Sequence, residues 1–213
     1  KEIGIKTSQL DGRLFASVAV YEQERVAFNA NSPVSNQPTI SDGVEFEMRY
    51  VPTNNLSLVA TYSNAETRVI TPGGTTFSYI GAADLPNVKP ETIFGGIIGG
   101  HHAVGTEPLR GALPETIISV SGFYKLSDRI TVSLSATDVD ETEPSVLGGL
   151  VLPDYTLVNA SIVYATESFT AGLFGNNLTD EAYFRGNFPS LYGNNAILPE
   201  LPRNWRAEVS YKF

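Results

Sequence analysis

The last residues of the chain alternate strictly between apolar and polar side chains. Polar residues occupy the even positions, and the apolar partners at the odd positions are Trp205, Ala207, Val209, Tyr211 and Phe213. A period of two predicts a β-strand with one apolar and one polar face. Such a strand needs an apolar neighbour on one side and water on the other, so the neighbour is either a protein core or lipid.

Strand patterns recur along the whole chain, whereas helical periodicity is hard to find. Clean alternation occurs at 44–50, 56–63 and 130–137, and residues 1–9 form a plausible first strand. Further strands, with apolar residues on both faces, are predicted at 13–24, 115–125, 154–165 and 169–178. Together with the final segment this makes about nine strands, and the predicted fold class is all-β.

The connections between these strands fall into two alternating classes. Short turns are predicted at 10–13, 52–55, 126–129 and 166–168, and each contains residues suited to tight turns. Long connections rich in Gly, Pro and Asn cover 25–42, 69–113, 140–152 and 179–202. Tight turns at one end and long loops at the other are typical of an antiparallel outer-membrane β-barrel with periplasmic turns and extracellular loops.

Aromatic residues gather beside the short turns. Tyr50, Tyr124 and Tyr164 each precede a short turn, Phe169 follows one, and Phe213 ends the chain. In a lipid bilayer these rings would form one interfacial girdle. The alternative is that aromatic residues are simply enriched in strands. The opposite strand faces carry charges such as Glu45, Glu47 and Arg206, which suit a water-filled or plugged lumen better than a sandwich core.

Composition narrows the function classes. The 213 residues contain no cysteine, which excludes a disulfide scaffold and a Cys nucleophile. The net charge of −9 argues against nucleic acid as a partner. No apolar run is long enough for a membrane-spanning helix, and any export signal is expected outside these residues. We find no catalytic constellation and no cofactor motif, so an enzyme is not predicted.

Residues 150–213 resemble the C-terminal end of TonB-dependent outer-membrane receptors. The motifs occur in the family's order: Tyr155-Thr156-Leu157-Val158-Asn159, then Asn177-Leu178-Thr179-Asp180 with Tyr183, then Pro202-Arg203 with Trp205 and the terminal Phe213. The segments LDGRLFASVAVYEQE and GVEFEMRYVPTNNLSLVATYSNAETR also resemble late strands of the same barrel. The resemblance therefore covers nearly the whole chain.

The resemblance implies a 22-stranded barrel with an N-terminal plug. Such receptors import scarce nutrients, typically ferric siderophores, with energy from the TonB complex of the inner membrane. No plug or TonB box is readable here, and single-chain bacterial barrels have an even number of strands. We therefore expect residues 1–213 to be the C-terminal part of a longer receptor, or half of a split one. Its expected partners are the rest of the barrel and plug, the TonB complex through that plug, the outer-membrane assembly machinery, and lipid.

Candidate ligand contacts lie in the long connections. Phe184, Arg185 and Tyr192 combine aromatic and arginine side chains in one loop, and Arg110 adds a further arginine from another loop. Such side chains suit an anionic, aryl-bearing ferric chelate. The adjacent His101 and His102 are candidates for contacting a metal or ligand. The alternatives are a self-packed loop rim for the first group and an exposed polar loop for the histidines. No resident metal site is predicted, and the acidic DVDETE segment at 138–143 lacks the spacing of a calcium loop.

The final strand carries the best functional motif. Val209, Tyr211 and Phe213 resemble the signal that the outer-membrane assembly machinery reads, although a lipid-facing strand without such a role has the same pattern.

Two alternative functions stay open. One is a small standalone outer-membrane barrel of eight or ten strands that serves as an anchor or adhesion platform. The other is a soluble secreted β-sandwich, possibly an enzyme, against which the charged faces weigh.

Overall fold

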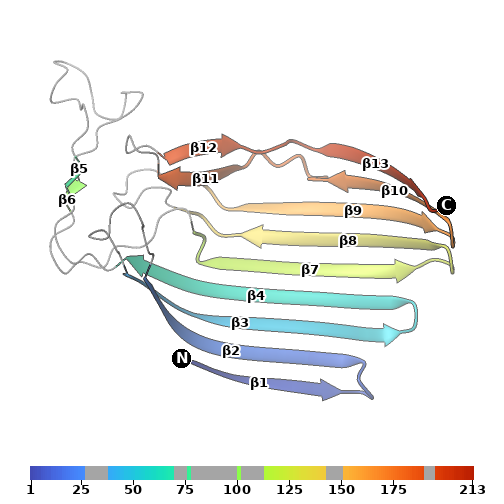
Figure 1. Ribbon diagram of the computed structural model, residues 1–213, viewed down its shortest axis with the longest axis horizontal. Coiled ribbons are helices and arrows are strands. Elements are labelled where there is room, and N and C mark those ends of the chain that lie inside the picture. The colour runs from blue at the N-terminus through green and yellow to red at the C-terminus, as the bar shows by residue number, and fades with distance from the viewer. Residues whose placement is uncertain (27–37, 70–75, 78–99, 102–112, 143–150, 190–194) are drawn as a thin grey trace.

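The computed structural model contains one nine-stranded antiparallel sheet. It describes residues 1–26, 38–69, 76–77, 100–101, 113–142, 151–189 and 195–213. The strands follow one another across the sheet as β1 (Glu2–Gln9), β2 (Leu14–Val26), β3 (Pro38–Thr53), β4 (Leu56–Val69), β7 (Thr116–Lys125), β8 (Ile130–Val139), β9 (Tyr155–Ala165), β10 (Phe169–Asn176) and β13 (Asn204–Tyr211) (Figure 1). The predicted all-β fold with nine main strands is confirmed. The sheet is open, because its first and last strands do not pair with each other.

Two short ribbons lie outside the main sheet, in connections that we predicted without strands. One pairs β5 (Thr76–Phe77) with β6 (Gly100–His101), and the other pairs β11 (Phe184–Pro189) with β12 (Asn195–Pro199). The prediction was wrong on these segments because a ladder of backbone hydrogen bonds needs no alternating pattern of side chains. Within the described ranges, no helix is long and apolar enough to cross a membrane.

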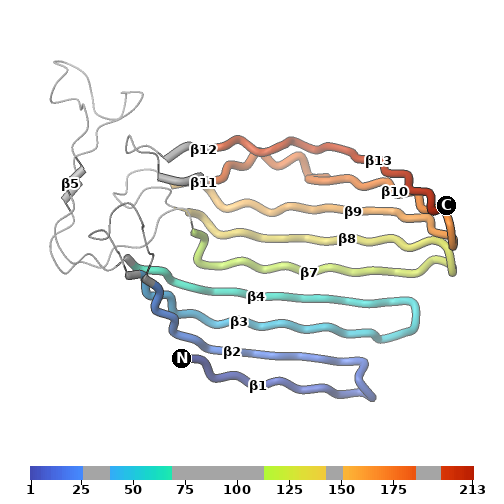
Figure 2. The backbone as a smooth tube through the Cα atoms, viewed as in Figure 1, coloured from blue at the N-terminus to red at the C-terminus, as the bar shows by residue number. Residues whose placement is uncertain are grey.

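The short turns lie together at one end of the sheet, on the right in Figure 2, where the chain also ends after β13. We call this the turn end, and the opposite end the loop end. The turn between β1 and β2 holds Leu10, Asp11 and Gly12 at positive φ, which explains a glycine there. In the other three turns a hydroxyl oxygen accepts a backbone N–H hydrogen bond, from Leu56 to Thr53 at 3.1 Å, from Ile130 to Ser127 at 3.1 Å and from Phe169 to Thr166 at 3.0 Å.

Cross-strand register brings an apolar row from each of the nine strands onto one face of the sheet, although some apolar residues, such as Phe123 and Val163, lie on the other face. Pairs such as Val18 with Phe46 and Leu173 with Ala207 connect neighbouring strands across this face. The side chains on it are strongly exposed, for example Leu134 at 60% and Val209 at 72%. On β8 the exposed positions alternate with half-buried ones from Ser133 onward, as expected when the polar side chains lie inside a curved sheet. We call the apolar face convex and the polar face concave.

A row of aromatic residues ends the convex face at the turn end. Tyr50, Tyr124, Tyr164, Phe169 and Tyr211 all share the parity of the apolar residues on their strands. The rings of Tyr164 and Phe169 lie 6.4 Å apart between centroids. The predicted gathering of rings beside the short turns is confirmed as a common level on a common face. Such a level is the usual boundary of a lipid-facing band in an outer-membrane barrel.

The convex face becomes polar toward the loop end. On β3 the apolar positions run from Val44 to Tyr50, about 20 Å at the usual rise per residue. Beyond them, Asp42 aligns with Glu22 on β2 and with Glu66 on β4. The strands β2, β3 and β4 have 13, 16 and 14 residues, more than the roughly 9–11 that cross a bilayer. They are longer than we predicted because backbone pairing continues where the apolar pattern stops.

The described part of the chain contains almost no buried core. Its buried apolar residues are Val139, Leu152 and Tyr183, all near the loop end. A β-sandwich buries one face of each sheet against the other, which leaves a row of buried side chains along every strand. The single exposed layer therefore does not favour the sandwich alternative, and the open sheet does not favour a small closed barrel.

Candidate ligand site at the loop end

A small cluster of buried side chains lies where β8 ends and β9 begins. Val139 pairs with Tyr155 across the two strands, and Leu152 forms an isolated bridge with Thr142 just beyond them. The ring of Tyr155 lies 4.6 Å from the ring of Tyr183, at an angle of 38°. This contact joins the start of β9 to the base of the β11–β12 ribbon, so the cluster gives the ribbon a fixed point on the sheet.

Arg185 lies over the Tyr183 ring of this aromatic pair. Its guanidinium carbon is 6.0 Å from the centroid of the Tyr183 ring, and its Nε atom is 3.4 Å from Oε1 of Glu200. The backbone N–H of Glu200 donates to the carbonyl oxygen of Tyr183 at 3.1 Å, which holds the two sides of the ribbon in register. The result is a cluster of one cation, one carboxylate and two phenol rings from three separate segments of the chain.

The electrostatics of this group keep the cation charged. Partial burial by itself lowers the pKa of Arg185, but the nearby carboxylate of Glu200 and the phenols of Tyr155 and Tyr183 raise it, so that the pKa lies above its ordinary value. The pair is also partly solvated, with the Arg185 side chain 58% exposed and that of Glu200 28% exposed. An ion pair of this kind contributes only about 0–1 kcal/mol, so an incoming anion can replace Glu200 at little cost.

The Asn177 side chain fastens the end of β10 to the segments around it. Asn177 is 3% exposed and has φ of 50°. Its Nδ2 atom donates to the carbonyl oxygens of Glu181 at 2.9 Å and Leu201 at 3.3 Å, and its Oδ1 atom accepts from the Glu181 N–H at 2.8 Å. Its own N–H donates to Oδ1 of Asn159 on β9 at 2.9 Å. Asparagine is one of the few residues that tolerates this left-handed backbone conformation.

A second connection ties the same turn to the start of β13. The Arg203 N–H donates to Oδ1 of Asp180 at 2.9 Å, and its Nη1 atom donates to the carbonyl oxygen of Leu178 at 3.4 Å. The Leu178 N–H in turn donates to the carbonyl oxygen of Val158 at 2.8 Å. The motifs that carried the family resemblance therefore contact one another here, and they hold both bases of the β11–β12 ribbon against the sheet.

The structure describes only part of the predicted ligand set, and its role in binding stays a prediction. Arg185 lies in the cluster described above, whereas Phe184 is 39% exposed and points to the opposite side of its strand. His101 lies in the β5–β6 ribbon, paired with Thr76. Tyr192, Arg110 and His102 fall outside the described residues. The described residues therefore do not bring the predicted set together, and within them no group of three or more His, Asp or Glu is arranged to hold a metal ion.

Sequence reasoning did not assign Tyr155, Tyr183 and Glu200 to the ligand site. The two tyrosines stood in the family motifs, which was the available signal, but nothing in their spacing indicated that the rings stack. Glu200 had no signal, because its pairing with Arg185 depends on the register of the ribbon.

The predicted assembly motif lies at the turn end of the last strand. Val209 and Tyr211 face the convex side, paired with Ala171 and Phe169. Tyr211 is 59% exposed, and its ring packs edge-on against Phe213 at 5.1 Å between centroids. This arrangement matches a lipid-facing strand, and the recognition role stays a prediction.

An open antiparallel sheet with an apolar convex face, an aromatic level and a polar concave face has the architecture of part of an outer-membrane barrel wall. In particular, the chain superposes along its full length on the siderophore receptor PiuA from Acinetobacter baumannii, with a TM-score of 0.70 and 20% identity. The whole chain also superposes on the ferric citrate transporter FecA, with a TM-score of 0.68 and 17% identity. It superposes equally completely on the ferripyoverdine receptor of the outer membrane of Pseudomonas aeruginosa, with a TM-score of 0.61 and 21% identity.

The chain spans 28%, 30% and 26% of the length of these three receptors. No family model matches the chain, and no curated protein matches it in sequence. At such low identity the likeness establishes the fold, and the predicted resemblance to receptor barrels is confirmed at that level.

Proposed function

We propose that the chain forms the C-terminal part of the barrel wall of a TonB-dependent receptor in the outer membrane of a Gram-negative bacterium. The observation that carries this proposal is the open nine-stranded sheet that follows receptor barrels over its whole length. The convex face contacts lipid, the turn end faces the periplasm and the loop end faces outward. The free edges of β1 and β13 pair with further strands of the same barrel, since unpaired strand edges are unfavourable in lipid.

The receptor imports a ferric chelate in this proposal. The concave face belongs to the lumen, a plug elsewhere in the receptor closes that lumen, and the TonB complex supplies energy through the plug. The assembly machinery reads the strand that ends in Phe213. None of the residues described here would be required for energy transduction, because they form the barrel wall and not the plug.

The cluster around Arg185 supports an anionic ligand with aromatic groups. The stacked phenol rings of Tyr155 and the buried Tyr183 form the base of the cluster, and a weak contact with Glu200 holds the guanidinium of Arg185 over the Tyr183 ring. A carboxylate or catecholate group on the ligand can take the place of Glu200, and an aryl group can stack on Arg185. A ferric citrate transporter, a ferric-catecholate import receptor and a ferripyoverdine receptor share this fold, so these three complexes serve as probes.

The test measures uptake of radioactive iron by cells that produce the full-length receptor, in a host lacking its other iron receptors. Ferric citrate, a ferric catecholate and a ferripyoverdine are supplied separately. Arg185→Ala is expected to weaken binding of the imported complex about tenfold to a hundredfold, since a hydrogen bond to a charged group contributes about 1.5–3 kcal/mol. Glu200→Gln removes the internal competitor and is expected to leave binding unchanged or to strengthen it.

Arg129→Ala is the matched control, because Arg129 lies in the turn between β7 and β8 at the opposite end of the sheet. It should bind and import the complex like the parent. Failure of the parent receptor to import any of the three complexes would count against ferric-chelate import. Equal loss in the Arg185 and Arg129 variants would exclude a role for the cluster.

A further inference from the structure

One part of the concave face consists of small hydroxyl side chains. On β8 the concave positions from Thr131 to Thr137 are all serine or threonine, namely Thr131, Ser133, Ser135 and Thr137. On the neighbouring strands, Ser119 and Ser121 of β7 and Ser161 of β9 lie opposite Thr137, Ser135 and Ser133, whereas the flanking positions carry other residues such as Phe123, Lys125 and Val163. We call these seven residues the hydroxyl wall. It carries no formal charge and no long side chain.

Four of the seven residues of the hydroxyl wall bond to one another in pairs. Ser119 bonds to Thr137 at 3.1 Å, and Ser133 bonds to Ser161 at 2.7 Å, in each case across neighbouring strands. Ser121 lies directly opposite Ser135. Because these short side chains bond to one another, the wall needs no protein partner in front of it. Each hydroxyl also keeps a lone pair or a proton for a weak, exchangeable bond to water or to a polar solute.

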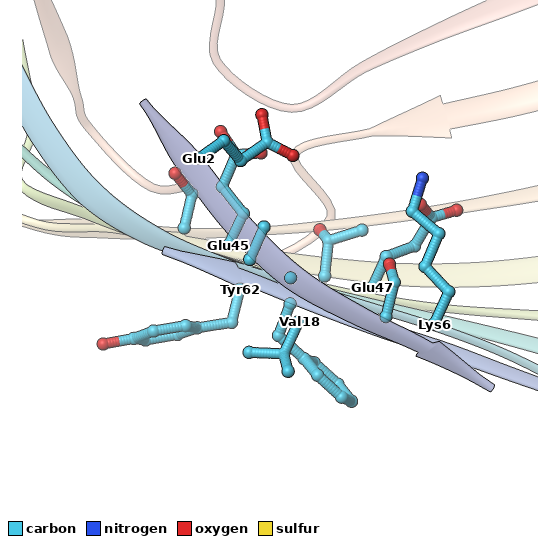
Figure 3. Close-up of a pocket in the computed structure, with 12 residues that line it drawn as sticks. Glu2, Lys6, Val18, Glu45, Glu47 and Tyr62 are labelled. Carbon is cyan, nitrogen blue, oxygen red and sulfur yellow. The ribbon is translucent and has the colours of Figure 1, made fainter. Parts of the chain in front are cut away.

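The neighbouring part of the concave face is charged. Glu2, Lys6, Glu45 and Glu47 point to the same side of the sheet, away from Val18 and Tyr62 on the other side (Figure 3). Within the described residues, these four charged residues make no ion pair with one another or with any other side chain. We call them the charged patch. It lies on β1 and β3, beside β4, whereas the hydroxyl wall lies on β7, β8 and β9.

These two surfaces favour different neighbours inside a lumen. Unpaired charges are stabilised when a second protein surface supplies opposite charges, and such complementary pairs also set the position of the partner. A neutral surface that is already hydrogen-bonded gains little from a protein partner. Such a surface releases a hydrophilic solute readily. Neutral hydrogen bonds between the surface and the solute replace hydrogen bonds to water, with little net change in free energy.

We propose that the hydroxyl wall faces water inside the intact receptor and lines the path that a hydrophilic ferric chelate follows past the plug, while the charged patch is covered by the plug. This inference rests on the proposed function and assigns the transit path to β7, β8 and β9. The convex side of the same strands is apolar, so a single residue step changes the environment from water to lipid.

Cysteine accessibility tests the assignment without a ligand. This chain has no native cysteine, so single variants at three positions are informative once any cysteines elsewhere in the receptor are replaced. Ser135→Cys lies on the hydroxyl wall, Ser17→Cys lies beside Lys6 in the charged patch, and Ala136→Cys faces lipid. Intact cells producing the full-length receptor are treated with a membrane-impermeant maleimide, and labelling is read on the purified protein.

We expect Ser135→Cys to be labelled, and Ser17→Cys and Ala136→Cys to be protected. Labelling of all three after unfolding in detergent and urea shows that each thiol is reactive. Equal labelling or equal protection of Ser135→Cys and Ser17→Cys would overturn the proposal, and so would labelling of Ala136→Cys in the folded receptor. The labelling result does not depend on whether the receptor imports iron. A failure of the transit-path proposal is therefore distinguishable from a failure of the proposed function.

A transport measurement supplies the second arm. Ser135→Trp places an indole on the wall, and a well-packed barrel wall cannot move aside to accommodate it, so uptake should fall about tenfold or more. Binding at the cell surface should remain unchanged, because Ser135 lies within β8, away from the Arg185 cluster. The probe is whichever of the three radioactive ferric complexes the parent imports. Unchanged uptake by Ser135→Trp, or equal loss in Ser135→Ala, would contradict a transit path at this wall.

Discussion

Asn177 offers a direct test of how the loop end is held together. Two of its side-chain hydrogen bonds are short, at 2.8 and 2.9 Å, and the third is longer, at 3.3 Å. With about 1 kcal/mol for each good bond, their loss costs about 2–3 kcal/mol of local stability. Because φ is 50°, a residue with a Cβ but without a local hydrogen bond adds about 1 kcal/mol of backbone strain.

The substitutions Asn177→Gly and Asn177→Ala separate these contributions. Glycine adopts positive φ freely, so Asn177→Gly should lose only the hydrogen bonds, about 2–3 kcal/mol, whereas Asn177→Ala should lose about 3–4 kcal/mol. Asn176→Ala is the matched control, because Asn176 donates one side-chain bond, to Asn204 at 3.0 Å, and lies in regular strand. Its expected cost is about 1 kcal/mol.

Hydrogen exchange of the full-length receptor in lipid nanodiscs measures the effect. The informative amides are those of Leu178 and Arg203, which bond to Val158 and Asp180 and not to the Asn177 side chain. Opening of the turn should speed their exchange roughly 30-fold or more in Asn177→Gly and further in Asn177→Ala, at 1.4 kcal/mol per factor of ten. Exchange at these amides that matches the Asn176→Ala control would refute the reasoning.

Three further predictions follow from the two faces of the sheet. Leu134→Lys puts a charge on the lipid face and should destabilise the folded barrel by about 2–4 kcal/mol, whereas Ser135→Lys on the lumen face should cost clearly less; urea unfolding in lipid vesicles compares them. Trp205 is the only tryptophan of this chain and is 63% exposed on the convex face. After any other tryptophans of the receptor are replaced by phenylalanine, brominated lipids should quench its fluorescence. Absence of quenching would contradict lipid contact. Deletion of Phe213 should lower the amount of receptor in the outer membrane without changing the unfolding of the fraction that assembles, and a normal amount would remove the assembly role.

The candidate ligand cluster was only partly predictable. Arg185 was proposed as a ligand contact because arginine and aromatic residues suit an anionic chelate, and that inference needs no coordinates. Its neighbours come from three separate segments, with Tyr155 at the start of β9, Tyr183 before β11 and Glu200 after β12. Their meeting depends on the connections through Asn177 and Asp180, whose hydrogen bonds join residues far apart in sequence. No local pattern encodes such distances.

The fold was far more predictable from sequence. Alternation with a period of two is a local property, and it places Val44, Phe46 and Met48 on one face whatever the neighbouring strands do. Turn residues such as Asp11 and Gly12 are also local, which is why the short turns and the nine main strands were predicted.

The sequence by itself thus determined which residues share the apolar face, where the short turns fall and how the strands succeed one another. Tertiary structure decided how far the strands continue beyond the apolar band and where the β11–β12 ribbon forms. It also decided which hydroxyls bond across strands, as Ser133 does with Ser161. The physical reason is that side-chain alternation is set within one strand, whereas hydrogen bonds between strands depend on register, and register depends on the whole sheet.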